Sequence, residues 1–144
     1  MTMPAGRYYV GDLCYVMHDA WTEVCRLFFP ADAPPKGVEG EFTLKDGRRF
    51  ASFATAYGDG EYRSSINTLH SVDSGSIGCI RVEDIRDHEY SQEKLEQLGA
   101  FVEFTEPFEV GNDQGMLTFG HVQIETAGGY DWDEEEEDCF SEEE

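Results

Sequence analysis

Short β-favouring segments separated by glycine-containing turns run through most of the sequence and constrain the fold more than any other feature. The clearest case is residues 41–56, where an alternating apolar run precedes Asp46-Gly47 and a second β-rich run follows it. An Asp-Gly pair between two such runs predicts a β-hairpin. Further tight turns are expected at residues 58–60 and 73–75, since both contain Asp and Gly. The centre of the chain is therefore expected to form an antiparallel meander.

Two segments favour helices instead. Residues 19–29 carry apolar side chains at three- and four-residue spacing, and Asp19 is the expected N-cap. Ser91 is expected to cap a second, short helix that stops at Gly99.

The remaining β-favouring segments extend the sheet and do not alternate with helices in the regular way that marks a parallel sheet. They are residues 7–10, 13–17, 100–105, 108–110, 116–119 and 122–126. We therefore predict an α+β fold, a mostly antiparallel sheet of about seven to nine strands with two short helices.

The domain organisation follows from length and from one break in composition. A chain of 144 residues has the usual size of one domain. After Gly128-Gly129, residues 131–144 contain ten acidic residues and no basic one. We expect residues 1–129 to form a single α+β domain and residues 130–144 to be an acidic C-terminal tail.

The charge excludes several classes of partner. The chain has 31 acidic and 10 basic residues, a formal net charge of -21. Binding to nucleic acid requires a basic footprint, and anionic membranes attract basic segments, so we expect neither direct nucleic-acid binding nor membrane binding. The first residues lack the pattern of a signal peptide and no run reaches the ~18 apolar residues of a transmembrane helix, so a cytoplasmic protein is expected.

The cysteines and histidines show no ligand spacing. Cys14, Cys25, Cys79 and Cys139 are spread singly, which favours free thiols over disulfides and predicts no zinc site. We expect no metal and no other cofactor. A nucleophilic pair such as Cys25 with His70 stays open as an alternative.

Three aspartates are the candidates for an enzymatic site. Asp73, within residues 71–78, stands in a segment that resembles the Asp-Ser/Thr-Gly signature of aspartic proteases, in which two aspartates share a proton. Only one copy is present, so that resemblance implies a dimer, and the alternative is a structural turn that selects Asp and Gly. Asp59 and Asp12 each follow a glycine near tyrosines. We predict no catalytic residue, and keep Asp73, Asp59 and Asp12 as candidates for a small hydrolase or metal-assisted enzyme.

The acidic tail is the expected partner-binding element, because two aromatic side chains stand within its charge. The alternatives are a solvating tail and, less in keeping with the spacing, a calcium site. The expected partner-binding residues are Asp131, Trp132, Asp133, Glu134, Glu135, Glu136, Glu137, Asp138 and Phe140.

Three segments carry a resemblance: GDLCYV at 11–16, AYGDG at 56–60 and DSGSIG at 73–78. They are similar to segments of small uncharacterised proteins of bacteria and their phages, which implies no activity. In charge and size the chain also resembles acidic nucleic-acid mimics and inhibitors of the anti-defence or immunity type. That resemblance implies an inhibitor that occupies the basic nucleic-acid-binding site of a partner, such as a nucleic-acid-binding enzyme. The alternatives are the enzyme described above and a structural interaction module whose acidity maintains solubility; the oligomeric state stays open.

Overall fold

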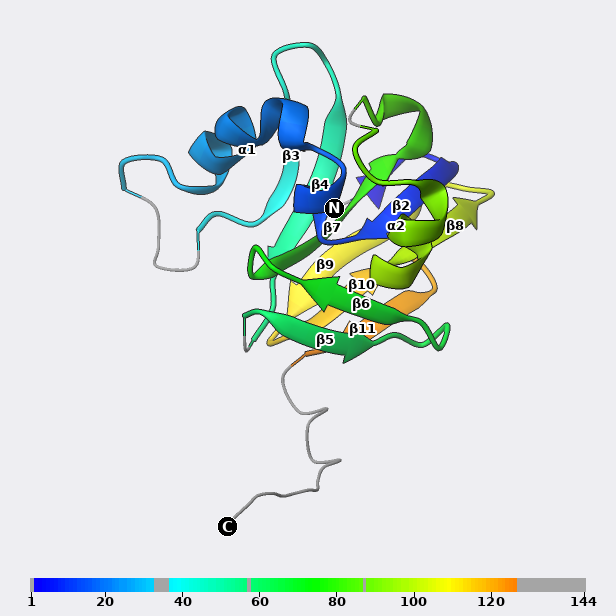
Figure 1. The fold of residues 1–144 in the computed structure, drawn as a ribbon. Coiled ribbons are helices and arrows are strands. Elements are labelled where there is room, and N and C mark those ends of the chain that lie inside the picture. The colour runs from blue at the N-terminus through cyan, green and yellow to red at the C-terminus, as the bar shows by residue number, and fades with distance from the viewer. Residues whose placement is uncertain (1, 33–36, 57, 87, 127–144) are drawn as a thin grey trace.

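The protein folds into two facing antiparallel sheets with helices on the outer side of one of them (Figure 1). The structure is a computed structural model and describes residues 2–32, 37–56, 58–86 and 88–126. These residues form 11 strands and two α-helices, α1 (Trp21–Phe28) and α2 (Gln92–Leu98). The predicted α+β class and its antiparallel character are confirmed, and the strand count is somewhat higher than expected.

The larger sheet has five strands, and every neighbouring pair is antiparallel. Its strands, in spatial order, are β3 (Gly40–Thr43), β4 (Arg49–Ala54), β7 (Ser76–Arg81), β2 (Gly6–Gly11) and β8 (Ala100–Phe104).

The second sheet has four strands and is joined to a separate hairpin by a single bridge between Ser64 and Ile124. Its strands, in spatial order, are β1 (Thr2–Met3), β9 (Phe108–Asp113), β10 (Met116–Phe119) and β11 (Val122–Glu125), and the hairpin consists of β5 (Gly60–Arg63) and β6 (Leu69–Val72).

The expected hairpin at Asp46-Gly47 is confirmed, because β3 and β4 pair across it and Gly47 has a φ of 97°. The continuous meander predicted for the centre is wrong. β4 pairs with β7, and the β5–β6 hairpin is inserted between them in the sequence. This arrangement lets β7 occupy the buried middle of the larger sheet, where both of its faces are covered.

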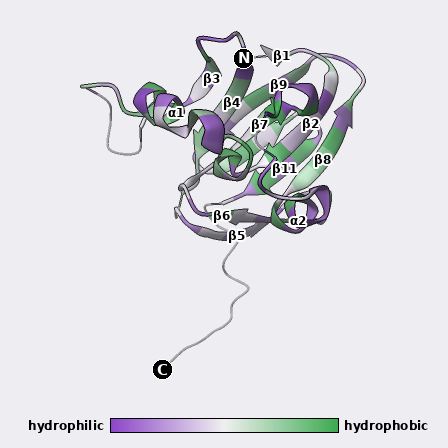
Figure 2. Ribbon diagram, turned by 45° about the horizontal axis from the view of Figure 1, so that its top comes forward, coloured by the Kyte–Doolittle hydropathy of each residue, from purple (hydrophilic) through white to green (hydrophobic). Residues whose placement is uncertain are grey.

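The core lies on both faces of the larger sheet, since alternate residues of a strand point to opposite faces. On β2, Tyr8 and Val10 pack into a cluster that includes side chains of the second sheet. Tyr9, between them, packs with residues of α1 and α2 on the other face. Figure 2 shows apolar residues concentrated on the strands, whereas the two helices carry both polar and apolar residues.

The expected cap of α2 is confirmed: Ser91 accepts a hydrogen bond from Lys94 N, and Gly99 follows the last helical turn. The expected cap of α1 is wrong. A 3-10 turn, His18–Ala20, precedes this helix, and Ala20 makes no side-chain cap bond. Asp19 instead accepts a hydrogen bond of 2.9 Å from Arg48 Nη2, because that buried guanidinium requires a counter-charge.

The extended segment predicted at residues 13–17 is also wrong, since Leu13–Tyr15 form a 3-10 turn. The Asp12 carboxylate accepts from Cys14 N and so stabilises this turn, against the β preference of its apolar residues.

Neither helix in the described part of the chain has the length and apolar composition of a membrane span.

Candidate functional site

Asp12, immediately after β2, carries a buried carboxylate that accepts four hydrogen bonds. Its side chain is 0% exposed. Oδ1 accepts from Cys14 N at 2.9 Å and from the Ser74 hydroxyl at 2.8 Å, while Oδ2 accepts from the backbone N–H groups of Asp73 and Ser74, both at 2.7 Å. Four donors satisfy a buried carboxylate, so Asp12 joins the end of β2 to the turn between β6 and β7.

Asp73 lies in that turn, as the sequence predicts, and Gly75 supplies its positive φ of 80°. The Tyr15 hydroxyl donates to Asp73 Oδ2 at 2.8 Å. Burial, followed by the bond to Asp73, raises the pKa of Tyr15 well above its ordinary value, so this phenol stays a donor. Asp12 and Asp73 thus have separate donors, and no hydrogen bond joins their carboxylates within the described ranges. Asp12 and Asp73 therefore do not share a proton as the two aspartates of a protease dyad do; the dimer that the resemblance implies stays a prediction.

Asp59 is exposed and lies close to the same turn. Its Oδ1 lies 4.0 Å from the position that a Cβ on Gly75 would take. The structure therefore brings Asp12, Asp59 and Asp73 to one turn. No group of three or more His, Cys, Asp or Glu side chains suited to a metal ion occurs in the part of the chain that is described.

Cys14 lies beside these carboxylates and is half-buried. Burial, and then the negative charge of Asp12 with smaller effects of Asp73 and Asp59, raises the pKa of its thiol far above the ordinary value. The thiolate is the nucleophilic form, so Cys14 is unreactive at neutral pH. Burial also raises the pKa values of Cys25 and Cys79, and no disulfide joins any two of these three cysteines. Cys139 lies outside the described residues.

His70 on β6 is fully buried and does not pair with a cysteine. Its Nδ1 lies 3.2 Å from the carbonyl oxygen of Val10, and its Nε2 has no hydrogen-bond partner among the described side chains and backbone. Burial lowers the pKa of His70 to about 4, so the ring is neutral at pH 7. The expected alternative of a Cys25–His70 pair therefore finds no contact.

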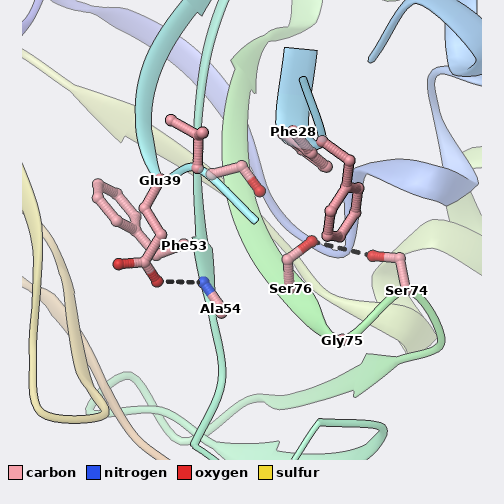
Figure 3. A pocket seen from close by; sticks show the side chains of 10 residues that line it. Phe28, Glu39, Phe53, Ala54, Ser74, Gly75 and Ser76 are labelled. Carbon is pink, nitrogen blue, oxygen red and sulfur yellow. Dashed lines mark hydrogen bonds between the residues drawn. The ribbon is translucent and has the colours of Figure 1, made fainter. Parts of the chain in front are cut away.

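A small hollow adjoins the turn, between the end of α1 and the strands β4 and β7 (Figure 3). Its volume is about 30 Å³, enough for a water molecule or two and too small for an organic substrate. The hydroxyl oxygens of Ser74 and Ser76 lie 3.0 Å apart at its wall, and Glu39 accepts from Ala54 N at 2.6 Å. Phe29, 54% exposed, lines its rim.

The acidic side chains are distributed unevenly over the fold. Residues 88–126, which form α2 and the strands β8 to β11, contain eight acidic residues and one base, Lys94. All but Glu125 of these acidic side chains are exposed. A count of charges by segment in the sequence already indicates this excess, which the prediction of a partner-binding tail leaves out. We define the acidic segment by the exposed carboxylates of α2, the edge strand β8 and the start of β9: Glu93, Glu96, Glu103, Glu106 and Glu109.

Residues 2–86 are more balanced, with 12 acidic and nine basic residues. Several of these bases are engaged in ion pairs. Arg48 pairs with Asp19 and Asp46, both at 2.9 Å, and Arg86 pairs with Asp46 at 3.2 Å. The net negative charge of the described residues is therefore concentrated in their second part.

The tail residues predicted to bind a partner, Asp131 to Asp138 and Phe140, lie outside the described residues, as does the predicted domain boundary at 129. Searches against protein-family models, curated proteins and solved structures find no match.

Proposed function

We propose that the chain is a non-enzymatic interaction protein whose acidic surface occupies a basic nucleic-acid-binding site of a partner protein. It acts in the cytoplasm, in keeping with its free thiols. The observation that carries this proposal is the acidic segment, in which exposed carboxylates follow one another along α2, β8 and β9 with Lys94 as the one base of residues 88–126.

Fixed carboxylates on a folded surface can replace phosphates in a basic groove. Strands and a packed helix hold their backbone in place, so little ordering entropy is lost on binding. Glu103 stands on the edge strand β8, and Glu106 follows at the corner before β9. The ten acids of residues 131–144 add charge of the same sign.

The hydrogen bonds of the candidate catalytic carboxylates also support a non-enzymatic function. Asp12 is buried and fully engaged by N–H and O–H donors, and Asp73 accepts from Tyr15. Asp12 therefore has little capacity left to act as a general base.

The experiment captures the partner from the cells that encode the protein and then measures its binding after purification. Binding should fall steeply when salt rises from about 0.1 M to 1 M, because the Debye length shrinks from ~10 Å to ~3 Å. Duplex DNA or RNA should compete for the same site of the partner. Replacing Glu103, Glu106 and Glu109 by Gln should slow association about tenfold.

The matched control removes three exposed acids elsewhere, with Asp32→Asn, Glu61→Gln and Glu83→Gln. It should change association much less than the variant of the acidic segment. Equal effects of the two triple variants, or binding that is unaffected by salt, would contradict the proposal and favour an apolar interface.

A further inference from the structure

A polar cavity of about 220 Å³ lies where β1 meets the end of the larger sheet. Its wall contains two arginines, Arg49 of β4 and Arg81 of β7. It is completed by Met3, Pro4, Tyr8, Gly47 and Asp84. All of these residues lie within the described ranges.

The strand register places the two arginines on neighbouring strands at the wall of this cavity. Phe50 of β4 pairs with Ile80 of β7, so the next residues outward, Arg49 and Arg81, stand opposite each other on the same face. Arg81 is in turn opposite Tyr8 of β2. Like charges directly opposite on neighbouring strands repel. This row of Arg49 and Arg81 is therefore unfavourable unless negative charge compensates it.

The protein compensates the row only in part. Glu41 accepts from Nε and Nη2 of Arg49, and Arg81 Nη2 donates to Ala5 O at 2.8 Å. Among the described residues, Arg81 pairs with one carboxylate, that of Glu83, which lies 3.9 Å away and is 76% exposed, so the pair is weak. Arg81 Nε is buried and has no hydrogen-bond partner within the described chain.

The surroundings hold the two arginines in place. The Tyr8 hydroxyl donates to Pro4 O at 2.7 Å, which connects the start of the chain to β2, and Arg81 is held by Ala5 in the same segment. A guanidinium carries five N–H donors in a planar fork that fits the oxygens of a carboxylate or a phosphate. Glu41 engages one side of the Arg49 guanidinium, so the donors that this cavity offers an oxyanion are the buried Nε of Arg81 and the remaining N–H groups of the two arginines.

We propose that this cavity, the Arg49/Arg81 pocket, binds a small organic molecule through a carboxylate or phosphate group. Its volume is below the ~300–1,000 Å³ of sites for drug-sized ligands, so the ligand is a small metabolite. Asp84 places a carboxylate in the wall of the pocket. Its negative charge disfavours a ligand of high negative charge, and its oxygens can accept a hydrogen bond from a donor group of the ligand.

The test follows backbone amide shifts by NMR while inorganic phosphate, or succinate in a second arm, is added at constant ionic strength with chloride as the reference salt. Saturable shifts at Tyr8, Gly47 and Arg81 are expected in at least one arm. Saturation by phosphate alone identifies a phosphoryl ligand, and saturation by succinate alone identifies a carboxylate. Shifts that grow linearly in both arms would overturn the proposal.

Three variants locate the binding. Arg49→Gln should lower the affinity for the anion about tenfold, the equivalent of one charge-assisted hydrogen bond. Asp84→Asn should strengthen it, because a like charge is removed from the wall. The control Arg63→Gln removes the same charge from β5, where Arg63 bonds to Asn67, and should leave the affinity unchanged. Equal weakening by Arg49→Gln and Arg63→Gln would reduce the effect to overall charge and refute the site. Arg81→Gln would also remove the hydrogen bond to Ala5 O and so change the structure of the pocket. The location of the binding site is therefore tested with Arg49→Gln and Asp84→Asn.

Discussion

Asp12 follows β2, and His70 of β6 contacts Val10 O near the end of β2. Both are 0% exposed, yet their hydrogen bonding differs sharply. Asp12 accepts from four donors, whereas His70 has one contact, to Val10 O, and an Nε2 without a partner in the described structure. A buried polar group stabilises a fold when its partners replace the water it loses, and otherwise costs free energy. The comparison separates a carboxylate that holds the fold together from an imidazole that the fold only tolerates.

The difference also bears on function. A carboxylate with every oxygen engaged by donors has little capacity left for a substrate or a metal ion. An uncharged, buried imidazole is likewise separated from solvent protons. The end of β2 therefore has the composition of a catalytic site, and its hydrogen bonds are those of a structural joint.

The largest effect is expected from Asp12→Ala. The substitution leaves the N–H groups of Cys14, Asp73 and Ser74 without their acceptor and disconnects β2 from the turn that precedes β7. We expect the free energy of unfolding to fall by about 4 kcal/mol, measured by denaturant unfolding.

The control for this change is Asp59→Ala, which removes an exposed carboxylate at the same turn. It should change stability by less than about 0.5 kcal/mol. If both substitutions cost the same, the hydrogen bonds of Asp12 are not what connects these strands.

The next effect is a pH dependence that comes from His70. Burial lowers its pKa from 6.5 to about 4 in the folded protein, so the unfolded chain binds a proton at higher pH than the folded chain. Stability should therefore fall as the pH drops from 6.5 towards 4, by about 3 kcal/mol in total, and level off below that. Unfolding measured at a series of pH values gives this curve.

Carboxylates also titrate at low pH, so the curve is compared with that of His70→Leu, which keeps an apolar side chain of similar size in the core. The part lost in this variant belongs to His70. A wild-type curve that coincides with that of His70→Leu would show that His70 is protonated as easily in the fold as outside it.

Local signals predicted most of the elements. Asp46-Gly47 sets the β3–β4 hairpin, and Ser91 sets the start of α2, because each turn or cap depends on residues a few positions apart. The order of strands did not follow from such signals. Nothing near β4 in the sequence indicates that it pairs with β7 and leaves β5 and β6 aside.

The candidate site shows the same limit. The sequence selected Asp12 and Asp73 by residue type, but the bond from Ser74 to Asp12 spans 62 positions and has no local signature. Asp19 was assigned to a helix cap from its neighbours, while its partner Arg48 lies 29 positions away. Contacts of this range depend on which strands pair, and so they become visible only with the fold.

The smallest expected effect tests how evenly the four donors of Asp12 contribute. Ser74→Ala removes one hydroxyl and keeps the three backbone donors, so the carboxylate stays engaged and the fold should lose only about 1 kcal/mol. Ser76→Ala is the matched control, because the Ser76 hydroxyl contacts Ser74 and makes no bond to Asp12 in the described structure. It should cost less than about 0.5 kcal/mol. If Ser74→Ala lowers stability as much as Asp12→Ala does, the Ser74 hydroxyl is the main contact of Asp12, and the backbone N–H groups contribute little without it.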